Sequence, residues 1–273
     1  MSRINQSNEY DALIKKIQRK RKTVIALTII AVLIVYAACM PVRIEFLNET
    51  IVDYKGINPV ITVVLVILIL FIEGIAYALV SSPLTTSMDI ECDPQKHLVL
   101  NDILNKKKNK DNIYAADYFY MGNFEAALNY ANRMISGNNP ALVILGLLNK
   151  ARCEYFLGDF ESLKLTVEQY EDSLNNLKKV NQKTKDAFDK ISKSMKLLVA
   201  ISEEDKEGIS CYKGIEAWNN SKATEGYINY LKGIAAFIEE NKEEAVYRFM
   251  SVKEKCPKTF LAGKSQEYLG KIK

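Results

Sequence analysis

Two stretches of this sequence follow one pattern: YMGNFEAALNYANRMI (residues 120–135) and YFLGDFESLKLTVEQY (residues 155–170). In each, an aromatic residue precedes a glycine, Gly122 or Gly158, and a polar residue, Phe and Glu follow it. Apolar residues three or four positions apart on both sides of the glycine are typical of one helix face. Because glycine readily adopts the left-handed conformation of a tight turn, we predict that each stretch joins two antiparallel helices.

The pattern recurs further along the chain. A good copy covers residues 228–257, with Gly233 in its first helix, Ala245 in its second and Pro257 at its end, where proline stops a helix. A poorer copy covers residues 190–218. The four predicted turns are Gly122, Gly158, Glu203 and Glu240.

These hairpins resemble the tetratricopeptide repeat, a helical hairpin of about 34 residues. The resemblance covers residues 113–257 and rests on small residues where paired helices cross: Ala115 with Ala127, Ala151, Gly208, and Gly233 with Ala245. The second copy departs from the family pattern because it has Leu163 at the small position. The resemblance implies an all-α fold, an α-solenoid of about four hairpins. The alternative is an unrelated helical bundle with chance spacing.

Two apolar runs precede the repeats, TVIALTIIAVLIVYAACMPV (23–42) and PVITVVLVILILFIEGIAYALV (59–80). About 20 residues of helix cross the ~30 Å hydrocarbon core of a bilayer. Neither run shows the polar stripe of a soluble helix. We therefore predict two transmembrane helices that form a hairpin.

The flanking charges predict the orientation of this hairpin. Residues 1–22 hold seven Lys and Arg, residues 43–58 hold two and residues 81–110 hold five. The positive-inside rule places both termini in the cytoplasm and the short loop outside, in the cell (inner) membrane of a bacterium. An alternative is a cleaved lipoprotein signal before Cys39, although Tyr36 and the long basic leader disfavour it.

The predicted organisation has six parts. They are a basic juxtamembrane segment (1–22), the first membrane helix (23–42), an external loop (43–58), the second membrane helix (59–80), a linker with a short capping helix (81–112) and the cytoplasmic repeat domain (113–273). Within the linker, SSPLTTS favours turns. Asp93 and Pro94 suit the start of the capping helix.

The formal net charge of +4 belongs to the membrane-proximal part. Residues 111–273 hold 23 basic and 23 acidic residues, so a nucleic-acid partner is not expected. Basic clusters beside a membrane helix attract anionic lipids, which we expect as partners.

Candidate catalytic and metal sites are sparse. The one histidine, His97, is expected to be solvated, and the five scattered cysteines are expected to be free thiols that pack as small apolar residues. Acidic pairs such as Glu239–Glu240 suit helix ends. Glu73 lies within an apolar run and is expected to face the other membrane helix or a second copy, which allows self-association. We expect no cofactor, no metal and no enzyme activity.

Tetratricopeptide arrays bind peptides on the concave face lined by their first helices. The resemblance implies a groove lined by Phe119, Tyr120, Arg152, Tyr155, Phe156, Tyr227, Tyr230 and Phe237. Several of these aromatic residues are equally compatible with the core. The predicted function is a non-catalytic membrane-anchored scaffold that binds a protein or peptide. The alternative is an accessory subunit of a membrane transport or secretion complex that acts through the hairpin.

Overall fold

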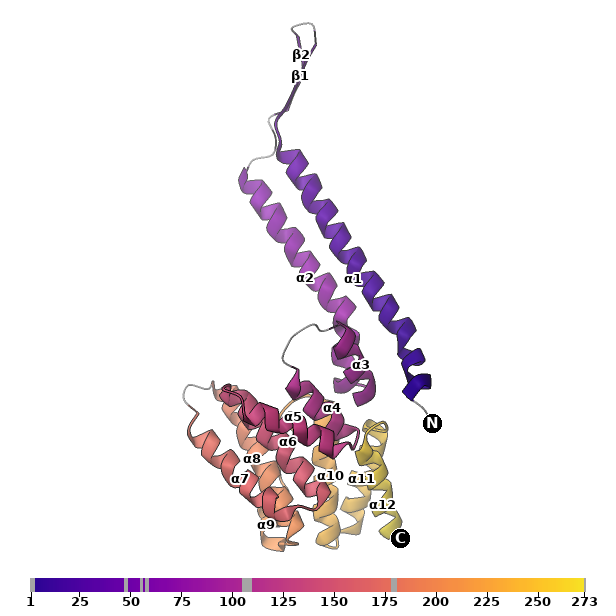
Figure 1. Cartoon of the computed structure of the whole chain (residues 1–273), viewed down its shortest axis with the longest axis vertical. Helices are drawn as coiled ribbons and strands as arrows, with labels where there is room; N and C mark the ends of the chain where they lie inside the picture. Colours follow the sequence, from indigo (N-terminus) through magenta and orange to yellow (C-terminus); the bar gives the residue numbers. More distant parts are fainter. Residues whose placement is uncertain are drawn as a thin grey trace. The chain divides into compact units, whose positions relative to one another are not determined.

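A computed structural model describes residues 3–46, 49–54, 56, 59–104, 110–177 and 181–272 of the chain. The chain divides into two compact units, Met1–Pro83 and Leu84–Lys273, which are treated separately below. Outside one two-stranded hairpin, the regular secondary structure of the described residues is helical (Figure 1).

The first unit holds a long helix, a β-hairpin and most of a second helix. They are α1 (Arg3–Cys39), β1 (Val42–Phe46), β2 (Glu49–Tyr54) and α2 (Pro59–Asp89). The strands pair antiparallel, from Val42 opposite Tyr54 to Phe46 opposite Glu49. Most of the basic segment 1–22 is thus the first half of α1, because its Lys, Arg and Gln residues favour helix and nothing before Pro41 interrupts it.

Two stretches of these helices, Tyr10–Cys39 (30 residues) and Ile61–Leu84 (24 residues), are long and apolar enough to cross a membrane. Their apolar side chains are exposed in the isolated chain; Phe71 and Leu79, for example, are 66% and 69% exposed. A soluble domain rarely leaves so much contiguous apolar surface open to water.

Residues 81–89 continue α2, so the predicted turn-rich linker is wrong. Pro83 lies inside the helix, where its missing N–H leaves the carbonyl of Leu79 without its usual donor. The Ser82 hydroxyl donates a hydrogen bond to this carbonyl at 2.8 Å. Side-chain compensation of this kind lets a proline remain inside a helix.

The second unit begins with the end of α2, and its described residues form ten further helices. They are α3 (Pro94–Leu104), α4 (Asp111–Tyr120), α5 (Phe124–Ile135), α6 (Pro140–Leu157), α7 (Phe160–Asn175), α8 (Gln182–Ser202), α9 (Lys206–Tyr212), α10 (Lys222–Ile238), α11 (Lys242–Lys255) and α12 (Phe260–Lys271). Helices α4 to α11 pack as four consecutive hairpins, and the first helices of neighbouring hairpins contact one another. The predicted capping helix is present as α3.

The same turn joins the two helices of every hairpin. One residue is left-handed, and its N–H and the following N–H reach carbonyls three and five residues earlier. In the first turn, Gly122 donates to the Phe119 carbonyl (2.8 Å) and Asn123 to the Tyr118 carbonyl (2.9 Å), which is a Schellman motif. The left-handed residues are Gly122, Gly158, Glu204 and Glu240, with φ from 53° to 78°.

An Asn or Asp follows each left-handed residue and caps the second helix. Its side-chain oxygen accepts a hydrogen bond from an N–H of the first helical turn; the four caps are Asn123, Asp159, Asp205 and Asn241. The third predicted turn, Glu203, is therefore wrong by one residue. Glu203 ends α8 in the right-handed conformation, and Glu204 carries the positive φ.

Most of the predicted small residues lie at helix crossings. Ala115, Ala127, Ala151 and Ala245 are fully buried. A Cβ on Gly233 would lie 2.7 Å from the Phe249 ring, so α10 and α11 approach more closely than a larger residue allows. Gly208 is half-buried, and an added Cβ would lie 3.0 Å from Ala200 of α8, so α8 and α9 also approach closely there.

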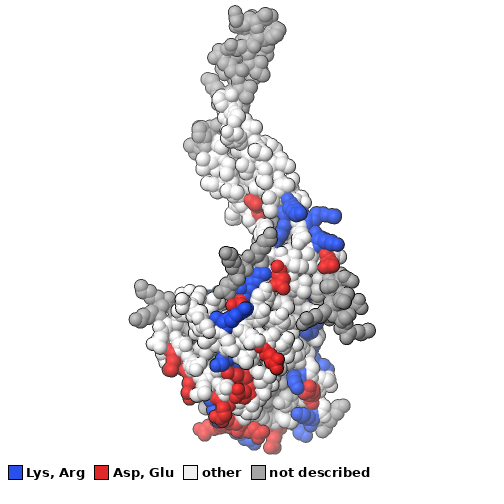
Figure 2. Space-filling model, viewed as in Figure 1, with Lys and Arg blue, Asp and Glu red and all other residues white. Residues whose placement is uncertain are grey.

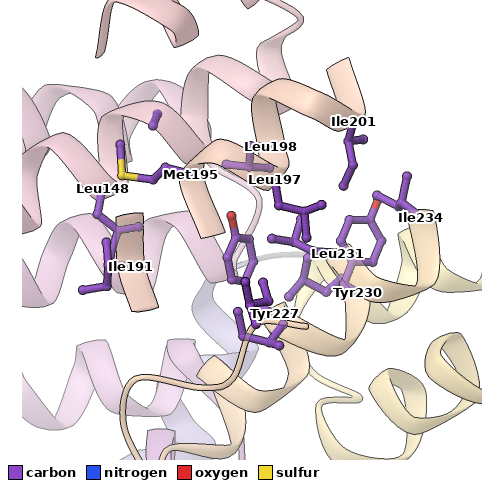
Figure 3. Close-up of a cluster of buried hydrophobic side chains, with 14 of the residues drawn as sticks. Leu148, Ile191, Met195, Leu197, Leu198, Ile201, Tyr227, Tyr230, Leu231 and Ile234 are labelled. Atoms are coloured by element: carbon purple, nitrogen blue, oxygen red, sulfur yellow. The ribbon is translucent and has the colours of Figure 1, made fainter. Parts of the chain in front are cut away.

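Part of the core lies between α8 and α10 (Figure 3). Leu197, Leu198 and Ile201 from α8 meet Leu231 and Ile234 from α10. All five are at most 5% exposed, which gives a dry apolar interface.

Acidic side chains gather at one end of the second unit, the lower end in Figure 2. This end carries the turns of the last three hairpins (Figure 1). Glu203, Glu204 and Glu240 are exposed there, and Glu239 is half-buried beside Lys213 at 2.7 Å. These carboxylates are therefore hydrated or paired with a surface lysine, as predicted for helix ends.

Candidate binding surface

The structure brings the predicted groove residues into one aromatic cluster inside the second unit. The ring centres of Phe119 and Phe156 are 5.8 Å apart, and the same distance separates Phe156 from Tyr230. Phe119, Tyr120, Arg152, Tyr227 and Tyr230 are buried, whereas Tyr155, Phe156 and Phe237 are half-buried. The sequence left open whether these residues line a groove or belong to the core. The buried ones belong to the core.

Helix α12 explains why the predicted concave face is filled. The Phe260 ring centre lies 4.8 Å from Phe156, 5.0 Å from Phe124 and 5.4 Å from Phe119. Farther along α12, the Tyr268 ring stacks on Phe249 at 4.9 Å. The first two hairpins and the last helix thus meet across the inner face.

Sequence reasoning missed α12 because the repeat pattern ends at Pro257. A signal was available in residues 260–269, where Phe260, Leu261, Tyr268 and Leu269 repeat at the seven- to eight-residue spacing of one helix face. That spacing predicts an amphipathic helix, although it does not show that the helix covers the aromatic cluster.

Arg152 is the charged member of this cluster, and its guanidinium is buried among aromatic rings. Its central carbon lies 4.2 Å from the Tyr227 ring centre, 4.8 Å from Trp218 and 5.2 Å from Phe119. Its Nε and Nη2 atoms have no hydrogen-bond partner among the described residues. Cation–π attraction, worth ~2 kcal/mol or more when the pair is desolvated, offsets part of its lost hydration.

Burial also sets the protonation state of the tyrosines around Arg152. Desolvation raises the pKa of Tyr227 and Tyr120 well above its ordinary value, and the nearby Arg152 charge opposes part of this rise. Both phenols therefore stay neutral at physiological pH, and the cluster carries the single positive charge of Arg152.

Part of the cluster remains open at the α6–α7 turn. We call Tyr155, Phe156, Leu157 and Phe160 the aromatic rim. Leu157 and Phe160 are 48% and 40% exposed, and the Tyr155 ring centre lies 6.1 Å from that of Phe160. Aromatic residues such as Tyr are enriched among the residues that carry most of the binding energy at protein interfaces, so the aromatic rim is the candidate binding surface.

Two surface grooves lie away from the rim. One, of about 550 Å³, is lined by the α5–α6 connection and the end of α7, including Pro140, Val143 and Leu177. The other, of about 400 Å³, lies between α7, α8 and α9, and an ion pair between Lys164 and Glu203 (2.8 Å) lies at its edge. Neither groove contains a residue of the predicted concave face.

His97 is not solvated, contrary to the prediction. Its Nδ1 lies 2.8 Å from the carboxylate of Asp117, which is 1% exposed, and its Nε2 lies 3.0 Å from the Asn101 amide. Desolvation raises the pKa of Asp117 to about 6, although the bond from His97 opposes it. The pair joins α3 to α4, a contact between residues 20 positions apart that the sequence does not reveal.

All five cysteines are free, and Cys92, Cys153 and Cys256 are buried, in line with the sequence prediction. Two of them are in contact: the sulfurs of Cys92 and Cys256 are 3.0 Å apart. Cys211 is exposed.

Glu73 faces α1 in the first unit, one of the two positions expected for it. It lines a groove of about 290 Å³ with Val24, Leu27, Thr28 and Ala31 of α1 and with Ile69, Ile72 and Ala76 of α2. Nearer the second unit in sequence, Arg21 donates to the Ser81 hydroxyl at 2.6 Å and lies over the Tyr77 ring. Polar contacts therefore join the two helices on one side of this apolar groove.

Within the described part of the chain, no group of three His, Cys, Asp or Glu side chains could hold a metal ion. No family model matches this sequence. Neither a curated protein nor a solved structure matches it.

Proposed function

We propose that this chain is a non-catalytic, membrane-anchored adaptor whose tetratricopeptide-like domain binds a protein partner. The observation that carries the proposal is the succession of four hairpins built on one turn, with their first helices in contact, in a chain that begins with two helices of membrane-spanning length. Stacked helical hairpins of this kind present extended surfaces for peptides and proteins.

The aromatic rim is the part of the predicted groove that a partner would reach. Phe160 and Leu157 offer exposed apolar surface. Behind them, Phe156 is fixed by the packed rings of Phe124 and Phe260, and Tyr155 packs against Phe156. A rigid anchor loses little conformational entropy when it is covered, which favours binding. We assign the buried members of the cluster to the support of this rim.

In this proposal the domain works at the cytoplasmic face of the bilayer. The lysines and arginines of α1, from Lys15 to Lys22, would contact anionic headgroups at roughly 1 kcal/mol each. The anchor would then concentrate the second unit at the membrane, where its partners would also be found.

Site-specific photocrosslinking tests this proposal. The full chain carries a photoreactive phenylalanine analogue at position 160 and is illuminated in its native membranes. The matched control carries the analogue at Leu165, which is 59% exposed and lies about 140° around the same helix. We expect a discrete protein adduct from position 160 and none from 165. Equal adducts at both positions, or none at position 160, would contradict a specific site at the rim.

A second candidate function is suggested by the groove that contains Glu73. A carboxylate in an apolar membrane segment costs ~2.5 kcal/mol or more, so such residues usually have a role. The chain would then be an accessory subunit of a transport or secretion complex that acts through α1 and α2. In that case Glu73→Gln abolishes activity of the complex while the adduct from position 160 persists. The adaptor proposal expects Glu73→Gln to leave both the activity and the adduct unchanged.

A further inference from the structure

The thiols of Cys92 and Cys256 come from opposite ends of the second unit. Cys92 lies between α2 and α3, and Cys256 ends α11, yet their sulfurs are 3.0 Å apart and both side chains are 0% exposed. In the part of the chain that the structure describes, no other two thiols make contact. A contact between residues so distant in sequence is set by the fold and not by local geometry.

The surrounding residues hold both thiols in place. Cys92 adopts a positive φ of 48°, a conformation that is costly for a residue with a side chain. The next residue, Asp93, is bound from both sides: its N–H donates to the Ser87 carbonyl at 2.8 Å, and its carboxylate pairs with Lys258 at 2.6 Å. The segment around Cys92 is thus fastened to the segment that follows Cys256.

The position of the Cys256 side chain is equally constrained by its neighbours. Its sulfur lies 3.2 Å from the Lys222 carbonyl oxygen. A Cβ on Gly226 would lie 2.4 Å from this sulfur, so the thiol fits only because residue 226 has no side chain. If Cys256 only filled space as a small apolar residue, it would need neither a glycine beside its sulfur nor a second thiol in contact with it.

We propose that Cys92 and Cys256 form a reversible disulfide, with a low-molecular-weight disulfide such as oxidised glutathione as the oxidant. A disulfide bond is about 2.05 Å long, so the two sulfurs must approach by about 1 Å. Because both side chains are 0% exposed, the step requires the turn that carries Cys92 to open far enough to admit the oxidant. It is independent of the proposed binding function.

The two thiols have different roles in this reaction. The hydrogen bond from Cys256 lowers the pKa of Cys92, and the same bond raises the pKa of Cys256. The Cys92 thiolate attacks one sulfur of oxidised glutathione, whose S–S bond breaks and releases one glutathione thiolate. Cys256 then loses its proton to water and attacks the Cys92 sulfur, which releases the second glutathione. Two electrons and two protons thus pass from the protein to the oxidant.

The disulfide would enclose α3 to α11 in one covalent loop. Closing a loop of this length removes much conformational freedom from the unfolded chain and so stabilises the folded domain. The oxidised and reduced proteins should therefore differ in melting temperature by roughly 5–15 °C.

The test uses the full chain in detergent with Cys39→Ala and Cys211→Ala, which removes the two thiols that are not fully buried. The protein is incubated with oxidised glutathione or with dithiothreitol, and remaining thiols are alkylated. Peptide mass spectrometry should find the Cys92 and Cys256 peptides joined, two hydrogens lighter than their sum, in the oxidised sample alone. The oxidised protein should melt at the higher temperature.

Matched variants complete the experiment. Adding Cys92→Ala or Cys256→Ala should abolish both the joined peptide and the change in melting temperature, whereas adding Cys153→Ala should leave both intact. Alkylation of both thiols after prolonged oxidation, or glutathione adducts without a joined peptide, would overturn the proposal. Because the joined peptide is sought in the protein with both thiols, a variant that fails to fold does not decide the result.

Discussion

Asp117 shows how one buried residue can set the pH dependence of this fold. Its pKa rises from the ordinary value of 3.8 to about 6 because its carboxylate is desolvated. The folded state therefore holds the proton more tightly than the unfolded state between these two values. The contribution of Asp117 to stability is present in full below about pH 4 and is lost as the pH rises through 6.

The variant Asp117→Asn removes this titration. We expect its free energy of unfolding, measured by denaturant titration, to approach or exceed that of the natural protein as the pH rises from 4 to 7. The difference between the two proteins should change by roughly 3 kcal/mol across this range. A constant difference would mean that Asp117 titrates normally and is hydrated in the folded protein.

Ala245 tests the close approach of α10 and α11. The residue is fully buried, and the adjacent Val246 is 36% exposed on the outer side of α11. Ala245→Leu should overpack the crossing and lower the free energy of unfolding by about 1–3 kcal/mol. Val246→Leu, the control, should change it by less than about 0.5 kcal/mol. Equal effects would place Ala245 outside the helix crossing.

At the scale of single residues, sequence reasoning worked where a local rule applied. It placed Ala115, Ala127 and Ala245 at crossings because small residues recur there with helical spacing. It failed for His97, because a hydrogen bond to a residue on another helix leaves no mark on the local pattern. The contact between Cys92 and Cys256 was missed for the same reason.

The hairpin turns are the elements that repeat most faithfully, and their chemistry differs between copies. Gly122 and Gly158 adopt the left-handed conformation without a side chain, whereas Glu204 and Glu240 adopt it with one. Left-handed backbone costs an ordinary residue roughly 1–2 kcal/mol. The last two hairpins thus carry a strain that the first two avoid.

Exchanging residues between the turns measures this strain. Glu240→Gly should raise the melting temperature by a few degrees, and Gly158→Ala should lower it by a similar amount. Gly158 is well suited because an added Cβ would have nothing within 4 Å, so only the backbone conformation is tested. Thermal unfolding followed by circular dichroism checks both. A stabilising Gly158→Ala would contradict the left-handed assignment of this turn.

The sequence predicted the glycine turns more accurately than the glutamate turns. Glycine before Asn or Asp marks the first two clearly, so Gly122 and Gly158 were placed correctly. In the third turn two glutamates stand side by side, and propensity alone does not choose between Glu203 and Glu204. Pro83 misled the prediction in the opposite direction, because the hydroxyl of Ser82 takes the place of the missing N–H.

At the scale of the whole second unit, the state of the predicted concave face depends on which helices pack against it. Repeat spacing predicts neighbours in the stack, but it does not tell whether the first and last helices meet. Here Phe119 on α4 contacts Phe260 on α12, so α12 fills much of the predicted concave face. The predicted groove residues were therefore found together and, in large part, buried.

Truncation of a buried ring and an exposed ring separates the core from the rim. Tyr230 is 2% exposed, so Tyr230→Ala should lower the free energy of unfolding by about 3–5 kcal/mol. Phe160→Ala removes a ring that is 40% exposed and should cost about 1 kcal/mol. Chemical denaturation followed by the fluorescence of the one tryptophan, Trp218, measures both. Similar small losses would show that the aromatic cluster is open to water.

The largest-scale prediction concerns the membrane. If both apolar helices cross the bilayer, the hairpin between them and the second unit lie on opposite sides. The seven basic residues in segment 1–22, against two in segment 43–58, favour a cytoplasmic N-terminus. An alkaline phosphatase fused after residue 50 should therefore be active outside, and a fluorescent protein fused after residue 110 should fold inside. An external residue 110 would place the second unit in an oxidising compartment, where Cys92 and Cys256 would be joined constitutively. In that case the proposed cytoplasmic adaptor would have to be abandoned.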